Sequence, residues 1–255
     1  MVGLLVMLVA VLVVTVLARL GRLAAPVAFG AATVFVLGAV AAELTDNVVD
    51  HDGLARVDPT ELNWMIAHRN GVLTPMAVAI SNAGDTVPMA GVAILACAVL
   101  AWRRRWAPMV LVAAATAGAG ILVTGLKTLV GRARPPVVDH LVAESNQSFP
   151  SGHSLGSSVV LGVLAAVIML YTRRRVVRVM AVVLAGLAVV AVGLSRLYLG
   201  VHWPTDILGG WVIGALWLVT CLTVYTRFHR AVPGPPTAIS TPHPSEVPHG
   251  RGGVG

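Results

Sequence analysis

The chain has 255 residues, of which 57% are hydrophobic and only 11% are charged. This composition is too apolar for a soluble domain of this length and too complex for a single anchor, so it indicates a polytopic membrane protein. A net charge of +7 would suggest a nucleic-acid partner in a soluble protein, but the basic residues separate apolar runs instead of forming a stripe, so we expect no nucleic acid.

Seven apolar runs follow one another, each near the ~20 residues that cross a bilayer as a helix. We predict an all-α, polytopic membrane helical bundle, with a six-helix core and one extra N-terminal transmembrane helix. The first run is not read as a cleaved signal, because Arg19 and Arg22 follow it instead of preceding it. The expected domains are the extra helix at 1–22, a membrane-embedded domain at 23–230 and a disordered cytoplasmic tail at 231–255. The runs lie at about 2–18, 26–44, 86–102, 107–126, 154–172, 179–199 and 205–226.

The segment between the second and third runs has a different character. Residues 72–83 contain too short an apolar run to span alone, so we expect an interfacial or re-entrant segment. Upstream, Leu62, Met65 and Ile66 recur at near-helical spacing, which predicts either a helix on the membrane surface or a cover packed on the outer ends of the bundle. Asp85 precedes a helix start and is read as a cap, with no chemistry assigned to it.

Arginine-rich connectors alternate along the chain with connectors that carry polar motifs. The positive-inside rule places the arginine-rich connectors in the cytoplasm. Counting Lys and Arg under this arrangement gives twelve residues inside and six outside. The motif-bearing connectors are therefore expected to face the periplasm or exterior of the cell membrane. The arginine-rich connectors lie at 19–22, 103–105, 173–178 and 227–230.

Cysteine and tail histidines offer no metal or disulfide pattern. Cys97 and Cys221 lie in separate apolar runs without CxxC spacing, and His243 and His249 lack ligand spacing in a tail rich in proline and glycine. We expect no metal and no cofactor. The tail is too poor in apolar residues to build a core, so we expect it to be disordered.

Three polar stretches are expected on the side of the membrane opposite the arginine-rich connectors. Lys127, the only lysine in the chain, begins the first stretch, and Arg134 and Arg196 add two more cations. Ser151 and Gly152 directly precede an apolar helix expected to begin near Ser154, so backbone N–H groups and the helix dipole would point at an anion. Fixed cations and backbone donors are what a phosphate monoester or pyrophosphate requires.

The histidines of these stretches supply a nucleophile and an acid. His202 and Asp206 are four residues apart, so the carboxylate can hold one ring nitrogen and leave the other free to attack phosphorus. His153, at a different helix end, is then available to protonate the leaving oxygen and later to activate water. Together the two histidines permit a two-step displacement without a metal.

The three stretches resemble the signature of the type 2 phosphatidate phosphatase superfamily. They read Lys, six residues, Arg-Pro at Lys127–Pro135; Pro-Ser-Gly-His at Pro150–His153; and Ser-Arg, five residues, His, three residues, Asp at Ser195–Asp206. The likeness covers about residues 50–226. It implies a six-helix core in which His202 forms a phosphohistidine assisted by Asp206, and His153 protonates the leaving group. It also implies phosphate binding by Lys127, Arg134, Ser151, Gly152 and Arg196.

The resemblance implies a membrane lipid phosphatase, with membrane lipids around it and a lipid phosphate as its substrate. The first expectation is a polyprenyl pyrophosphate such as undecaprenyl pyrophosphate, because the site faces outward. Phosphatidylglycerophosphate and phosphatidate stay open, as does phosphoryl transfer to an alcohol instead of water. Vanadate-dependent haloperoxidases share the signature, but a chain with seven apolar runs fits them poorly. A non-catalytic lipid-binding or transport bundle is the remaining alternative, although the spans carry almost no carboxylates.

Overall fold

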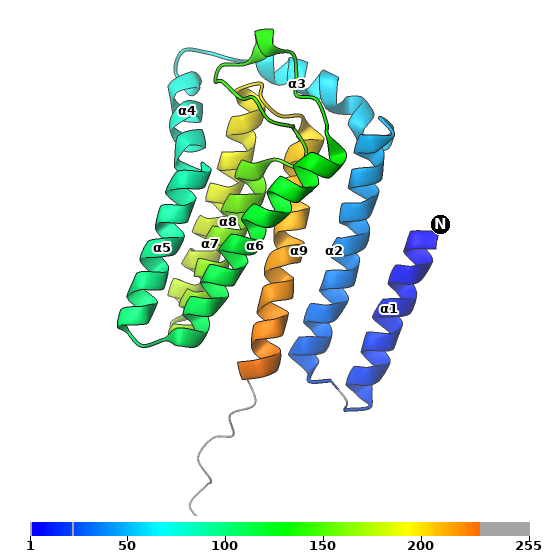
Figure 1. Ribbon diagram of the computed structural model, residues 1–255, viewed down its shortest axis with the longest axis vertical. Coiled ribbons are helices and arrows are strands. Elements are labelled where there is room, and N and C mark those ends of the chain that lie inside the picture. Colours follow the sequence, from blue (N-terminus) through cyan, green and yellow to red (C-terminus); the bar gives the residue numbers. More distant parts are fainter. Residues whose placement is uncertain (1, 22, 230–255) are drawn as a thin grey trace, which may run out of the picture.

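The computed structural model describes residues 2–21 and 23–229, and the regular elements within them are all helical (Figure 1). Long helices stand side by side, and short helices and loops cover one end of the bundle. The predicted all-α fold class is therefore confirmed. The helices are α1 (Val2–Arg19), α2 (Ala25–Val49), α3 (Asp58–Ala67), α4 (Leu73–Ala83), α5 (Thr86–Trp102), α6 (Trp106–Val130), α7 (Gly152–Tyr171), α8 (Arg175–Tyr198) and α9 (Pro204–His229), with short 3₁₀ turns at Gly53–Val57 and Val137–Asp139.

Five helices are long and apolar enough to cross a membrane, namely α2, α6, α7, α8 and α9, each of 20 to 26 residues. Helices α4 and α5 pass the same test only as a pair, and the chain bends by 47° between them. The five helices and this bent pair correspond to the six predicted core crossings. The segment expected to be interfacial or re-entrant is α4, and the bend makes the pair a broken span or a re-entrant loop.

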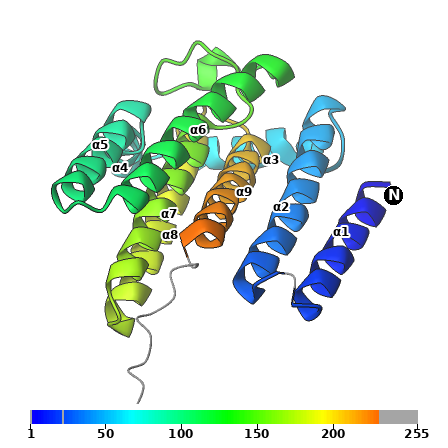
Figure 2. The ribbon, with the colours of Figure 1, turned by 60° about the horizontal axis from the view of Figure 1, so that its bottom comes forward.

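Helix α1 lies beside α2 at the edge of the bundle (Figure 2). Its apolar part, Met7–Arg19, is shorter than a full span within the described residues. The extra N-terminal crossing therefore stays a prediction. The tail at 231–255 lies outside the described residues.

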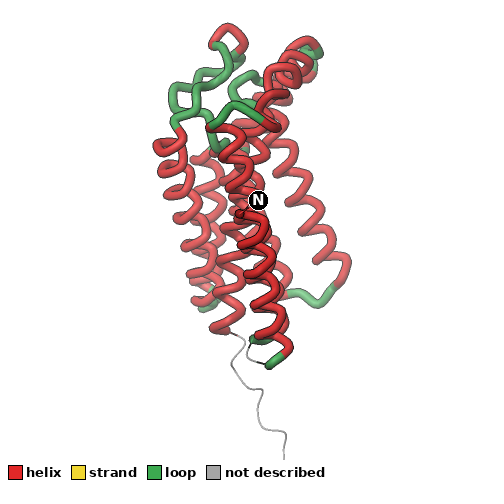
Figure 3. The backbone as a smooth tube through the Cα atoms, turned by 90° about the vertical axis from the view of Figure 1, so that its right-hand side faces the viewer, coloured by secondary structure: helices red, strands yellow, loops and turns green. Residues whose placement is uncertain are grey.

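The two ends of the bundle carry different connectors (Figure 3). The long α6–α7 connector, the α8–α9 connector and helix α3 gather at one end, at the top of Figure 1. The short α1–α2, α5–α6 and α7–α8 connectors lie at the other end, and they hold the clustered arginines. The motif-bearing and arginine-rich connectors are thus separated by the length of the bundle, as the alternation along the chain predicts.

Close packing between α7 and α9 fixes the end that carries the motifs. Two glycines of α9 are four residues apart and let the α7 backbone approach. A Cβ atom at Gly210 would lie 2.8 Å from the carbonyl oxygen of Ser151, and one at Gly214 would lie 3.1 Å from that of Leu155. Small residues at this spacing are typical of close contacts between membrane helices. The start of α7 is therefore held against the start of α9.

Helix α3 packs as a cover over this end of the bundle. Its Leu62 is only 2% exposed and forms a small apolar cluster with Leu197 of α8 and Ile207 of α9. This packing matches the second of the two alternatives drawn from the sequence. It also brings the first residue of α3, Asp58, into the interior, where it is 1% exposed.

Candidate active site

His202 and Asp206 form a buried pair at the start of α9. His202 lies in the α8–α9 connector and Asp206 in the first turn of α9, and each is at most 1% exposed. The Nδ1 atom of His202 is 3.3 Å from Oδ2 of Asp206. The same carboxylate oxygen accepts the backbone N–H of Trp203 at 2.8 Å and the hydroxyl of Ser148. These partners fix the carboxylate, and through it the plane of the imidazole.

The surroundings of His202 keep its ring neutral. Burial lowers the pKa of His202 to about 3, although the hydrogen bond and charge of Asp206 act in the opposite direction. Because Nδ1 faces a carboxylate, we assign the ring proton to Nδ1. The Nε2 atom then carries a lone pair, and it lies 3.3 Å from an Nη atom of Arg134. A neutral imidazole with a free Nε2 is the form that can attack phosphorus.

The second predicted histidine opens onto the same cavity. His153 and His202 both line a space of about 320 Å³ at the motif-bearing end. Lys127, Arg134 and Gly152 line it as well, so five of the eight predicted site residues share one cavity. Its remaining lining residues are Asp85, Thr86, Val123, Thr124, Thr128, Glu144, Asn146 and Gln147.

The other three predicted residues stand just outside this lining. Asp206 contacts the Nδ1 side of His202, away from the cavity. Ser151 is fully buried as the N-cap of α7, where its hydroxyl accepts the N–H of Ser154 at 3.4 Å. Helix α7 begins at Gly152, two residues earlier than expected. Its first N–H groups have no partner within the helix, so the start of α7 has the features of an anion-binding helix end.

The cations of the cavity are held by oxygens of the α6–α7 connector. Lys127, in the last turn of α6, donates to the side-chain oxygen of Asn146 at 3.0 Å and to the carbonyl of Gln147. Arg134 donates to the same Asn146 oxygen at 2.6 Å. The connector oxygens thus occupy the donors that a phosphate would need.

Glu144 completes this arrangement by joining two arginines. One carboxylate oxygen pairs with Arg134 at 3.2 Å, and the other pairs with Arg196. Arg196 lies in the last turn of α8, is 3% exposed and also donates to the hydroxyl of Ser81 at 2.6 Å. Burial alone would raise the pKa of Glu144, but the charges of Arg196 and Arg134 lower it overall, so the carboxylate is ionised at neutral pH.

Several residues of the site have no pattern in the sequence that predicts their role. Asp85 caps α5 as predicted, with its carboxylate 2.6 Å from the backbone nitrogen of Thr86, but it also lies 3.8 Å from Nε2 of His153. Glu144 has no helical or strand periodicity around it. Arg132 stands two residues before Arg134 in the first polar stretch, and this position was the only hint available.

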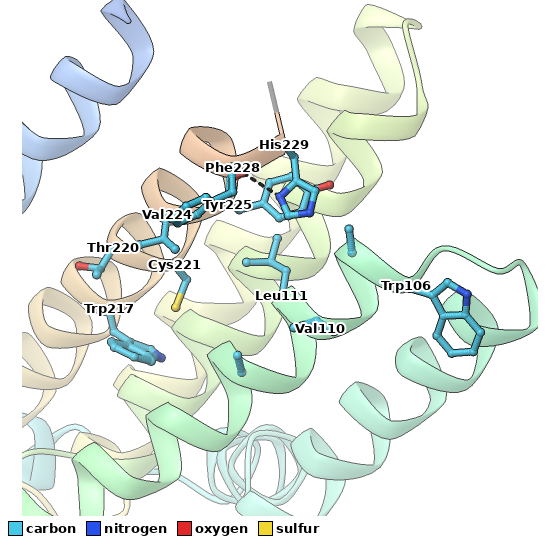
Figure 4. A pocket seen from close by; sticks show the side chains of 12 residues that line it. Trp106, Val110, Leu111, Trp217, Thr220, Cys221, Val224, Tyr225, Phe228 and His229 are labelled. Carbon is cyan, nitrogen blue, oxygen red and sulfur yellow. Dashed lines mark hydrogen bonds between the residues drawn. The ribbon is translucent and has the colours of Figure 1, made fainter. Parts of the chain in front are cut away.

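A second cavity, of about 520 Å³, lies between α6 and α9 at the opposite end (Figure 4). It begins at Trp106, the first residue of α6, and reaches Phe228 near the end of α9. Its walls are mostly apolar, and none of the predicted site residues lines it. The predicted site residues that line a cavity in the described part of the chain therefore all lie at the motif-bearing end.

Comparisons with known proteins support this fold. Residues 108–230, which include all eight predicted site residues, match the family profile described as the PAP2 superfamily. A solved transmembrane PAP2-type phosphatidylglycerolphosphate phosphatase from Bacillus subtilis has the same fold, with a TM-score of 0.73 and 26% sequence identity over 78% of this chain and 99% of that one. Over residues 108–230 the chain matches the PAP2 superfamily. The resemblance drawn from the three polar stretches is confirmed.

Two curated relatives have names that describe phosphatases. Phosphatidylglycerophosphatase B of Bacillus subtilis is 42% identical over 96 residues, which cover 36% of this chain and 45% of the relative. Undecaprenyl-diphosphatase of Sulfolobus acidocaldarius is 37% identical over 71 residues, or 28% of this chain and 30% of the relative. The chain thus spans less than half the length of these two relatives.

Proposed function

We propose that this protein is a membrane lipid phosphatase that hydrolyses the terminal phosphate of a lipid phosphate or pyrophosphate. One observation carries the proposal: two imidazoles, a lysine and an arginine line a single cavity at one end of an apolar bundle. Such a cavity suits a phosphate whose lipid tail stays among the helices or in the surrounding bilayer. Phosphatase names among the relatives support the same reading.

The reaction proceeds in two displacements at phosphorus. In the first, the Nε2 lone pair of His202 forms a bond to phosphorus while the bond to the lipid oxygen breaks, and His153 gives its proton to that oxygen. In the second, water attacks phosphorus, His153 takes the water proton, and the N–P bond breaks to release phosphate. The Nδ1–H bond to Asp206 holds the ring in place and stabilises its positive charge in the intermediate.

Charge in the cavity favours the transferred phosphoryl group. Lys127 and Arg134 would hold its nonbridging oxygens from one side, while Arg196 and the start of α7 would hold them from the other. Lys127 and Arg196 stand on helices and Arg134 lies in the α6–α7 connector, and all three must first leave the connector oxygens that hold them.

Two lipids are the substrates to compare first. A polyprenyl pyrophosphate fits a site on the outer face of the cell membrane, the side that the arginine distribution favours, and one relative is an undecaprenyl-diphosphatase. Phosphatidylglycerophosphate is the second candidate, because the Bacillus subtilis match by sequence and the Bacillus subtilis match by structure both carry that activity in their names.

The test measures phosphate release by the purified protein with a chelator present. Undecaprenyl pyrophosphate, phosphatidylglycerophosphate and phosphatidate would be presented in the same mixed micelles. We expect turnover of at least one lipid, and its loss in His202→Ala and His153→Ala. His68→Ala is the matched control, because His68 is exposed at the end of α3 and does not line the cavity. Equal phosphate release by all four proteins would contradict the mechanism.

A further inference from the structure

Arg132 is clamped between two buried carboxylates. One Nη atom donates to Oδ1 of Asp206 at 2.6 Å, and the other donates to Oδ2 of Asp58 at 2.6 Å. The side chains of Asp58, Arg132 and Asp206 are 1%, 8% and 0% exposed. Arg132 also lies over the ring of Trp203, 5.7 Å from its centroid. The guanidinium is therefore fixed on both edges and on one face.

Asp58 is joined to α9 by two more bonds. Its Oδ1 accepts the backbone N–H of Thr205 at 2.9 Å, and its Oδ2 accepts the Thr205 hydroxyl at 2.5 Å. The same hydroxyl accepts from Arg132 at 2.8 Å. Asp58 is the first residue of α3, so these bonds attach the cover helix to the first turn of α9, next to Asp206. Neither Asp58, Arg132 nor Asp206 lines the catalytic cavity.

Burying the charges of Asp58, Arg132 and Asp206 lowers the stability of the fold, which suggests that the cluster serves the reaction. Burying three charges carries a desolvation penalty that apolar side chains of similar size would avoid. The apolar contacts of Leu62 already dock α3 on the bundle. A second buried carboxylate is therefore not needed to hold the cover in place.

The net charge of the cluster explains why Asp58 is buried there. Arg132 alone would neutralise Asp206, and a neutral pair stabilises a positive imidazole poorly. Asp58 brings the cluster of two carboxylates and one guanidinium to a net charge of −1. That charge is what the His202 ring needs when it carries a phosphoryl group. Arg132 meanwhile binds Oδ1 of Asp206 and leaves Oδ2 to His202.

We propose that Asp58 is a positioning residue for the reaction: acting through Arg132, it orients Asp206 and preserves the negative charge behind the nucleophile His202. The inference rests on the proposed function, because it assigns Asp58 a part in the same phosphoryl transfer. Asp58 touches neither the substrate nor the reacting atoms. Its effect must therefore fall on the chemical step and leave phosphate binding unchanged.

The test compares Asp58→Asn with Glu61→Gln, a matched loss of one carboxylate from the exposed side of the same helix. We expect Asp58→Asn to lower kcat about tenfold or more, since small misplacements of catalytic groups have effects of this size. KM and the inhibition constant for inorganic phosphate should stay within about twofold of the wild type, because the cavity cations are untouched. Glu61→Gln should match the wild type in all three quantities.

A second variant keeps the test decisive where Asp58→Asn folds poorly in detergent. Arg132→Lys retains the positive charge but replaces the two Nη atoms, each of which binds one carboxylate, with a single nitrogen. It should show the same fall in kcat with an unchanged phosphate inhibition constant. A wild-type kcat in Asp58→Asn, or a weakened phosphate affinity in folded protein of either variant, would overturn the inference. Wild-type protein that releases no phosphate from any lipid would instead refute the proposed function.

Discussion

At the scale of single residues, the proposed phosphate site requires the bound phosphate to replace Glu144. Its carboxylate bridges Arg134 and Arg196, two of the three cations assigned to phosphate binding. A carboxylate and a phosphate cannot share these donors without repulsion. Substrate binding therefore requires the α6–α7 connector to release the arginines.

Glu144→Gln removes the charge that competes with phosphate and keeps the size of the side chain. We expect a lower KM and a lower inhibition constant for inorganic phosphate, each by about fivefold, which corresponds to about 1 kcal/mol for one partly exposed ion pair. Steady-state kinetics in detergent measure both quantities. Asp139→Asn in the same connector is the control and should leave them unchanged. A raised KM in Glu144→Gln would show that the carboxylate helps to bind the substrate instead of competing with it.

Residue chemistry was predictable only where the spacing along the chain reveals it. His202 and Asp206 are four residues apart, so their contact follows from local geometry. Asp58 and Thr205 are 147 residues apart, and nothing in a single sequence indicates that they meet. Arg132 adjoins a polar motif in the sequence, but nothing there indicates that it meets a buried Asp58. Glu144 was missed for the same reason, since its role comes from the folding back of a long connector.

At the scale of elements, the approach of α7 to α9 sets the geometry of the site. The start of α7 presents His153 and the free helix N–H groups, and the start of α9 presents Asp206. Gly210 lets these two helix ends touch, and the backbone N–H of Ser151 donates to the carbonyl of Asp206 at 3.0 Å. The contact joins the second and third polar stretches directly.

Gly210→Ala places a methyl group 2.8 Å from the carbonyl oxygen of Ser151. The helices must separate to accept it, at a cost of about 1–3 kcal/mol for overpacking. We expect a lower unfolding temperature and a loss of kcat of about tenfold, because His153 moves relative to His202. Gly186→Ala on α8 is the control, since a Cβ atom there meets nothing within 4 Å. Equal unfolding temperatures and kcat values in the two variants would refute this role of the contact.

The elements themselves followed from the sequence to a large extent. Five predicted runs are helices of spanning length because a bilayer sets both their length and their apolarity. The interfacial or re-entrant segment at 72–83 and the helix start at Asp85 predict a break between α4 and α5, but not its angle of 47°. A short polar break at Asp85 fits a kink, a loop or an interfacial turn equally well. The start of α7 was set two residues late, because Gly152 and His153 look like turn residues beside the capping Ser151.

At the scale of the whole molecule, the separation of motifs and arginines predicts which side of the membrane the site faces. The positive-inside rule places the site on the outer side. Val138→Cys, in the α6–α7 connector, would then react with a membrane-impermeant thiol reagent in intact cells, whereas Arg173→Cys would react only after permeabilisation. Both positions are exposed, and the native Cys97 and Cys221 lie within spanning segments. Labelling with the opposite pattern would place the site in the cytoplasm.

The central claim is that His202 carries the phosphoryl group during turnover. Rapid acid-free quenching of protein mixed with a substrate labelled in its terminal phosphate tests it most directly. A phosphohistidine is stable in base and labile in acid, so the account predicts a base-stable label on the peptide that contains His202. The label should be absent in His202→Ala. Label on any other residue, or turnover by wild type with no protein-bound phosphate at any time, would contradict the account.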